Sequence, residues 1–310
     1  GASKIANTGM GFAALTSIAA DLLKGIANNL QANIQIVIEA VGGEFFNVKN
    51  YAKGTATYVT AVPGFLADFG KPVSTSWGGQ LVMKYDPIQG DFKDHYGNKV
   101  SASTARRLFR TNTLFFNQYF GEHEAQVSAM FALMDATKVI ENETGNEITL
   151  LEAHKKYGVK DIYAKTNYTE KKRQDFQNKL HALNKRLHGV YNDFDKGTLQ
   201  RYSLGRLLTM YRKHMVPGFK RRYKKASMDQ ELGTVTEGYY RTFWNIFIKD
   251  LVRYNINIME AWSGYTPAQK SNIKKTVADI SIIISFMILA GLLTVGDDEE
   301  EKQKDKSYIH

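Results

Sequence analysis

The stretch that decides the fold is FAALTSIAADLLKGIANNLQANIQIVIEAV, which covers residues 12–41. Its large apolar residues recur at steps that average about 3.6, the period of an α-helix. Amide side chains and Glu39 occupy the other side, and Gly42-Gly43 follows, where a left-handed glycine can end a helix. The sequence therefore predicts a long amphipathic helix over residues 1–42. Because its polar side is rich in amides rather than cations, packing against a partner helix is favoured over a membrane surface.

The same period returns in the second half of the chain. Phe176, Leu180, Leu183, Leu187 and Tyr191 form a stripe typical of a packed helix. Residues 240–262 are apolar on two sides, which predicts a helix buried on more than one face. We therefore predict an all-α, elongated assembly of about seven helices. Its helical core is expected at residues 104–265.

Residues 43–103 differ from the rest of the chain in composition. They contain many glycines and three prolines, and two short runs rich in strand-forming residues, at 55–62 and 81–85. We predict an irregular, loop-rich insertion with room for one hairpin. Such a segment usually depends on a neighbour for order.

The composition of the chain excludes several kinds of chemistry. The chain has 310 residues, a formal net charge of +10 and no cysteine. Disulfides, cysteine-bound zinc and thiol catalysis are therefore excluded. The first residue is not methionine, and we expect the chain to be a portion of a longer polypeptide that surrounding subunits help to order.

One segment carries the whole excess charge. Residues 196–228 hold ten Lys or Arg and no Asp or Glu, with aromatic residues between them. Three interpretations remain open: contact with nucleic acid, contact with an acidic partner surface, or packing within the protein. The candidate contact residues are Lys196, Arg201, Arg206, Arg212, Lys213, Lys220, Arg221, Arg222, Lys224 and Lys225.

A second segment is conspicuously apolar. Ile280–Val295 has sixteen residues without a charge, about 24 Å of helix against a hydrocarbon core of about 30 Å. We predict an apolar helix at 266–296 and a solvated acidic tail at 297–310. A buried helix and a membrane-inserting helix both remain open; our prediction is that residues 277–295 pack against protein in a stored state and partition into lipid after release. The candidate membrane or helix-packing residues are Ile280, Ile284, Phe286, Leu289 and Leu293.

Motifs for catalysis are absent from the sequence. Residues 9–14 match G-x-G-x-x-A, but no strand precedes them and no βαβ unit follows. His181 and His188 lie seven residues apart without a carboxylate at ligand spacing. We therefore predict no catalytic, cofactor-binding or metal site, and a protein that is not an enzyme.

The last 130 or so residues resemble the large helical virion proteins of crAss-like bacteriophages. The resemblance lies in residues 192–196, 200–202, 205–206 and 210–223, followed by Glu237-Gly238-Tyr239 and the apolar helix. It implies a non-enzymatic cargo protein stored in the portal and tail interior of the virion and ejected into the host cell. Two alternatives remain: a nucleic-acid-binding protein that uses residues 196–225, and a membrane-inserting ejection-channel protein. The implied partners are the portal, the tail tube or barrel, other cargo chains in multiple copies, genomic DNA, and the host envelope membrane after ejection. The resemblance assigns no site residues.

Overall fold

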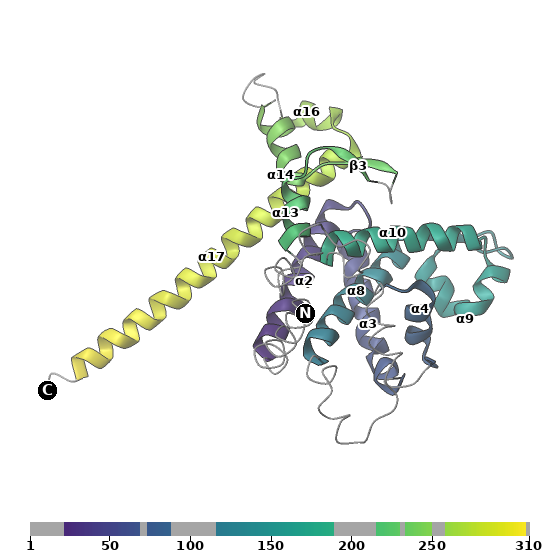
Figure 1. Ribbon diagram of the computed structural model, residues 1–310, viewed down its shortest axis with the longest axis horizontal. Coiled ribbons are helices and arrows are strands. Elements are labelled where there is room, and N and C mark those ends of the chain that lie inside the picture. Colours follow the sequence, from purple (N-terminus) through teal and green to yellow (C-terminus); the bar gives the residue numbers. More distant parts are fainter. Residues whose placement is uncertain are drawn as a thin grey trace, which may run out of the picture.

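The computed structural model describes residues 22–68, 73–87, 116–188, 215–229, 233–249 and 258–307. Of these residues 77% are helical, and their strands form two small antiparallel sheets (Figure 1). The prediction of a mostly α-helical chain is therefore confirmed.

A central helix, α8 (Phe116–Ala136), carries the core of the body. Every side chain from Ala125 to Met134 is buried, so neighbours enclose this part of the helix on all sides. The helices α2 (Leu22–Gly42) and α3 (Val48–Asp68) both pack against it. A Cβ atom on Gly54 of α3 would lie 2.6 Å from backbone atoms of α8, so the absence of a side chain permits this close approach.

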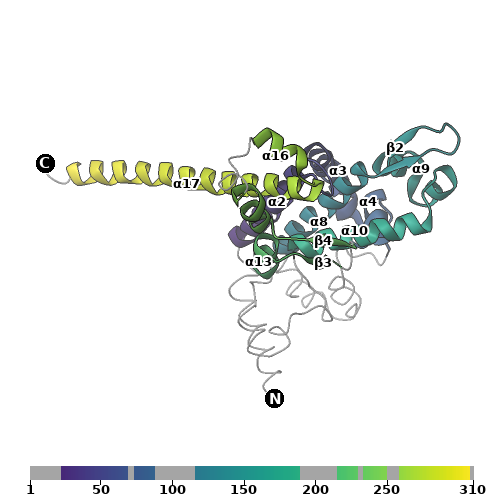
Figure 2. The ribbon, with the colours of Figure 1, turned by 90° about the horizontal axis from the view of Figure 1, so that it is seen from above.

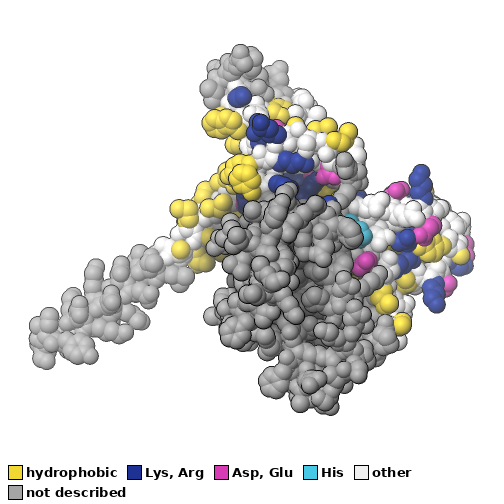
Figure 3. All heavy atoms as spheres, in the orientation of Figure 1, with side chains coloured by type: hydrophobic (Ala, Val, Ile, Leu, Met, Phe, Trp, Pro, Cys, Tyr) yellow, Lys and Arg dark blue, Asp and Glu magenta, His cyan; other side chains and the backbone are white. Residues whose placement is uncertain are grey.

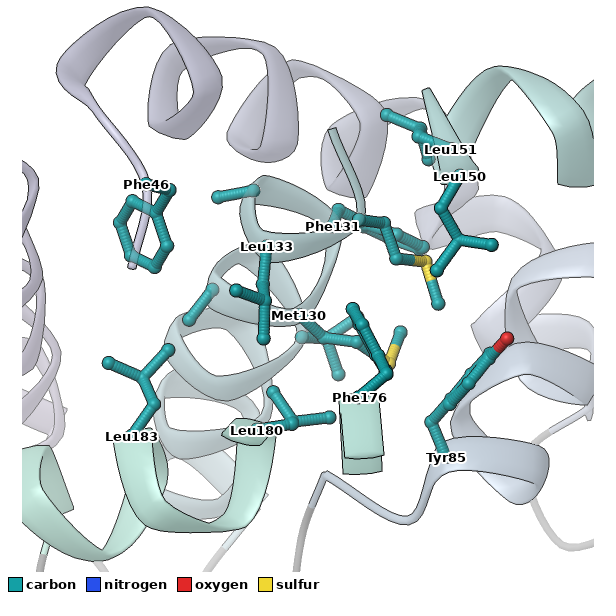
Figure 4. Close-up of a cluster of buried hydrophobic side chains, with 14 of the residues drawn as sticks. Phe46, Tyr85, Met130, Phe131, Leu133, Leu150, Leu151, Phe176, Leu180 and Leu183 are labelled. Atoms are coloured by element: carbon teal, nitrogen blue, oxygen red, sulfur yellow. The ribbon is translucent and has the colours of Figure 1, made fainter. Parts of the chain in front are cut away.

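The other side of α8 is covered by three shorter helices: α4 (Trp77–Tyr85), α9 (Leu150–Lys165) and α10 (Glu170–His188). Their side chains meet those of α8 in one hydrophobic cluster (Figure 4). The predicted stripe on α10 is confirmed as core as far as Leu187, and Tyr191 lies outside the described residues.

A small sheet joins α8 to α9. Strand β1 (Lys138–Ile140) pairs antiparallel with β2 (Glu147–Thr149). Thr149 ends β2 and also begins α9, where its side chain and that of Glu152 form a capping box. The sheet and the start of the helix are thus held by the same residue.

The remaining elements lead to one long helix, α17 (Pro267–Ser307). They are α13 (Met215–Tyr223), β3 (Ser227–Asp229), β4 (Thr234–Thr236), α14 (Tyr239–Thr242), the π-helical η1 (Phe243–Ile248) and α16 (Ile258–Gly264). Helix α17 begins against α2, α14 and η1 and then projects away from the body in both views (Figures 1 and 2). Thr266 caps it, as the Thr266-Pro267 pair predicts: its hydroxyl accepts from Gln269 N.

The predicted irregular insertion at 43–103 is wrong where the structure describes it. Both strand-like runs are helical, since residues 55–62 lie in α3 and residues 81–85 lie in α4. Thr57 and Tyr58 are buried in the body, and this tertiary packing overrides strand propensity. Pro63 has no backbone N–H and removes one hydrogen bond from α3. It lies on the exposed side of the helix, where the loss of that hydrogen bond destabilises the helix least. Residues 69–72 and 88–103 lie outside the described residues.

Two further predictions need correction. The Pro217-Gly218 pair predicts a break after a helix over 198–214, but α13 runs through Pro217, which sits in the first turn, where proline loses no helical hydrogen bond. The helix predicted at 240–262 is described only in part: α14 and η1 are helical, α16 ends at Gly264, and residues 250–257 lie outside the described residues. The acidic residues 297–301 continue α17 rather than starting a separate tail. A single glycine such as Gly296 costs a helix only about 1 kcal/mol, and good helix formers follow it.

The end of the first helix is confirmed. Gly43 has φ +71° directly after α2, as the Gly42-Gly43 pair predicts. The partner of its apolar face is α8 of the same chain. Residues 1–21 of the predicted helix lie outside the described residues.

Candidate functional site

The candidate site is the place where α17 leaves the body. On the body side of this place, α17 buries Ser271, Ile273, Lys275, Thr276 and Asp279. From Ile280 to Leu292 its large apolar side chains are exposed, except that Ile282 is half-buried. Figure 3 shows hydrophobic side chains along this part of the helix, next to Lys and Arg side chains of the adjoining elements.

The exposed apolar surface of α17 has no polar side. At about 3.6 residues per turn, its exposed large side chains point in every direction around the helix axis. The hydroxyl of Ser285 donates to the carbonyl of Ser281 at 2.8 Å, so even this polar side chain is satisfied within the helix. The exposed large apolar residues are Ile280, Ile283, Ile284, Phe286, Met287, Ile288, Leu289 and Leu292.

A charged network holds α17 at the last buried position before this surface. Arg222 of α13 donates two hydrogen bonds to the carboxylate of Asp279, from Nε at 2.8 Å and from Nη2 at 2.9 Å. The hydroxyls of Tyr239 and Tyr240 donate to the same carboxylate at 2.7 and 2.9 Å. These four residues are called the root of α17. Since an unpaired carboxylate next to sixteen uncharged residues would be costly to bury, the root explains how Asp279 is tolerated.

A second network lies one turn closer to the start of the helix. Lys275 Nζ contacts Glu39 Oε1 at 2.5 Å and Glu44 Oε2 at 2.7 Å. Arg186 of α10 donates to Glu44 at 2.8 Å. Burial alone would raise the pKa of Glu44, but the positive charges of Lys275 and Arg186 lower it to about 2. The carboxylate therefore stays ionised, and the network ties α17 to α2 and α10.

The basic segment divides at α13. Arg221 and Arg222 turn inward, where Arg221 donates to Gln35 Oε1 at 2.5 Å and Arg222 belongs to the root. The side chains of Lys220 and Lys225 are exposed, and Lys224 is half-buried. Packing within the protein thus accounts for two of the ten predicted contact residues. Five of the ten lie outside the described residues: Lys196, Arg201, Arg206, Arg212 and Lys213.

The apolar candidate residues stand together on α17. Ile280, Ile284, Phe286 and Leu289 are exposed, so within the described part of the chain this segment is not buried against protein. Leu293 lies on the same helix, but its side chain is outside the described residues.

The sequence pattern does not predict the root. Arg222 and Asp279 are 57 residues apart, and spacing at that separation carries no information about contact. A weak signal existed in Asp279 itself, a single carboxylate in an apolar stretch that needs a partner.

In the described part of the chain, buried polar side chains away from α17 form hydrogen bonds inside the core and do not line a site. His154 Nε2 lies 2.7 Å from the hydroxyl of Tyr85, which also contacts the hydroxyl of Tyr168. Burial lowers the pKa of His154 to about 4, so this imidazole is neutral at pH 7. Among the described residues, no group of three His, Cys, Asp or Glu side chains could hold a metal ion. His181 contacts the carbonyl of Asp86, whereas the side chain of His188 is outside the described residues.

Comparisons with known proteins identify no relative: no protein family, curated protein or solved structure matches this chain. One helix of the described residues, over 267–292, is long and apolar enough to cross a membrane.

Proposed function

We propose that the chain is a non-enzymatic protein that attaches to a lipid bilayer by inserting α17 from Ile280 onwards. The observation that carries this proposal is the distribution of exposed apolar side chains around the whole helix. A helix that docks in a protein groove needs only one apolar stripe, whereas a helix in lipid is apolar on every side. The uncharged segment is about 24 Å long, near the lower limit for a span, and modest thinning of the bilayer accommodates it.

The test uses the full chain and vesicles of phosphatidylcholine formed by detergent removal. We expect the protein to float with the vesicles and to resist extraction by alkaline carbonate. The double variant Ile284→Asp/Leu289→Asp should stay in the soluble fraction, because each charge in the hydrocarbon costs about 2.5–3.5 kcal/mol.

A matched control separates insertion from loss of fold. Val59 and Leu66 of α3 are also exposed, so Val59→Asp/Leu66→Asp adds the same charges away from α17. This control should float like the unmodified chain. If the unmodified chain remains soluble, or if both double variants float equally well, the proposal is wrong.

The setting of this activity is proposed from the resemblance. In a crAss-like virion the chain would be a cargo protein in the portal and tail interior, and insertion in the host envelope would follow ejection. Its partners there would be portal, tail tube or barrel, and other cargo chains. Mass spectrometry of purified virions tests this setting: the peptides of this chain should be present in intact particles and depleted after genome ejection.

Nucleic-acid binding through the basic segment receives less support. Arg221 and Arg222 are engaged inside the protein, which leaves Lys220 and Lys225 as the exposed cations of the described part of this segment. Lys224 is half-buried, and its Nζ donates to Thr236 Oγ1 at 3.3 Å. Affinity for duplex DNA measured at two salt concentrations distinguishes the cases. Tight binding that falls steeply with salt would favour nucleic acid as the main partner.

A further inference from the structure

Aromatic side chains extend from the root of α17 to the protein surface. The ring of Tyr240, whose hydroxyl binds Asp279, lies 5.5 Å from the ring of Tyr223, and that ring lies 4.9 Å from Phe219. Tyr223 is 47% exposed and Phe219 is 66% exposed. An unbroken line of rings thus leads from the last charged residue before the apolar segment out to solvent.

Trp244 adds a further exposed ring in the same region. It belongs to η1, which contacts α17, and it is 62% exposed. Large exposed aromatic rings are unusual on a surface that faces only water, but they are typical of the layer between lipid headgroups and hydrocarbon.

Lysines alternate with these rings. Lys220 follows Phe219, and Lys224 and Lys225 follow Tyr223 at the end of α13. Lys274 of α17 is exposed on the body side of Asp279. We call six residues the collar. They are three exposed rings, Phe219, Tyr223 and Trp244, and three lysines in or directly after α13, Lys220, Lys224 and Lys225.

The charges next to the apolar segment differ between its two ends. The collar supplies cations at the body end, whereas at the far end residues 297–301 are all Asp or Glu and Lys302, Lys304 and Lys306 follow only after them. Membrane helices carry their excess of Lys and Arg on the side with anionic lipids, and each lysine near such a surface adds about 1 kcal/mol of attraction.

We propose that the collar binds the phosphate headgroups of anionic lipids, so that the body rests on the anionic face of the bilayer from which α17 enters. This inference rests on the proposed function. The rings would lie at the depth of the headgroups, and the lysines would reach the phosphates. A basic surface for DNA alone would not explain why exposed aromatic rings join the lysines directly to an apolar helix.

The experiment compares two kinds of preformed vesicle with the full chain. One is phosphatidylcholine alone, and the other is phosphatidylcholine mixed with phosphatidylglycerol. We expect binding to the anionic vesicles to be tighter by at least about tenfold at low salt. The variant Lys220→Glu/Lys224→Glu/Lys225→Glu should lose this preference but keep its binding to phosphatidylcholine, because α17 is unchanged.

A matched triple variant controls for net charge. Lys160 of α9 and Lys171 and Lys172 in the first turn of α10 are exposed. Helix α9 lies on the opposite side of the body from the projecting part of α17 (Figures 1 and 2). Lys160→Glu/Lys171→Glu/Lys172→Glu changes the total charge by the same amount and should keep most of the preference. Equal loss in both triple variants would show an effect of net charge and overturn the collar.

The remaining outcomes separate the two proposals. If the chain binds both kinds of vesicle equally, insertion stands and the lipid preference of the collar is wrong. If it binds neither, the proposed function is wrong, and so is the proposed binding of lipid headgroups by the collar. If duplex DNA binds at low salt through the three collar lysines while anionic vesicles gain nothing, the surface is a nucleic-acid site and the inference is overturned.

Discussion

Lys275 and Glu39 form a buried ion pair that links two helices from opposite ends of the described chain. The Lys275 Nζ and Glu39 Oε1 atoms are 2.5 Å apart, and each side chain is only 4% exposed. The two residues are 236 positions apart in the sequence. The start of α17 is therefore fixed to α2 by a charge contact that neither helix would tolerate alone.

Removing the lysine should destabilise the body strongly. Lys275→Met leaves the two carboxylates of Glu39 and Glu44 facing the single positive charge of Arg186. Removing one partner of a buried ion pair in this way costs about 3–5 kcal/mol. We expect a clear fall in the urea midpoint of unfolding. Lys274→Met is the matched control, since Lys274 is the exposed neighbour, and it should change stability by less than about 0.5 kcal/mol. Similar midpoints for the two variants would contradict this assignment.

The first helix and its end could be predicted because they depend on local pattern. The 3.6-residue period of residues 12–41 and the Gly42-Gly43 pair are both readable without knowledge of the partner. The same holds for the Thr266-Pro267 start of α17. Residues 55–62 could not be predicted in this way: their threonines and valines favour strands, and only the contact with α8 makes them helical.

One part of the candidate site could be predicted from the sequence, and the other part depends on contacts between distant residues. The absence of charge in Ile280–Val295 is visible in the sequence, but the exposure of these side chains depends on where the body ends. The root joins residues from α13, α14 and α17 whose sequence separation hides the contact. Without knowledge of that contact, Arg222 looks like an exposed cation that could bind a polyanion, although its side chain points inward.

Two histidines should make stability depend on pH in a defined window: His154, which is buried, and His123, which is half-buried. Burial lowers the pKa of both His123 and His154 to about 4, from an ordinary value of 6.5. Between these values the unfolded chain binds more protons, so the free energy of unfolding falls as the pH falls from 6.5 towards 4. Each histidine contributes a slope of up to about 1.4 kcal/mol per pH unit.

Urea unfolding at several pH values between 5 and 6.5 checks this expectation, because most carboxylates remain ionised there. The variant His154→Asn should be less stable at pH 7 and should show a slope about half as steep. A stability profile in the unmodified chain that is flat over this window would contradict the burial of neutral histidines.

The close approach of α3 and α8 should not tolerate a side chain at Gly54. In Gly54→Ala the new Cβ would overlap backbone atoms of Ser128 and Ala132, which cannot move without shifting the core helix. We expect a loss of about 1–3 kcal/mol, measured as a lower thermal midpoint. Gly264→Ala is the control, since a Cβ there meets nothing within 4 Å. Equal midpoints would show that the helices can separate.

Trp244 should report directly on the membrane. On addition of vesicles that contain phosphatidylglycerol, we expect its fluorescence to shift to the blue and to be quenched by lipids brominated near the headgroup, since the collar places the ring at that depth. Trp244→Phe should lose most of this response. Trp77→Phe should retain it, because Trp77 stacks on Phe131 in the body at 5.6 Å. A response that survives in Trp244→Phe would place another tryptophan at the interface.

The continuity of α17 couples the body to the apolar segment. No linker separates the two, because the same helix is packed in the body and continues beyond it. Each copy therefore carries its apolar segment as a rigid extension of its body. The orientation of the body on the membrane surface and the tilt of the segment in the bilayer should change together.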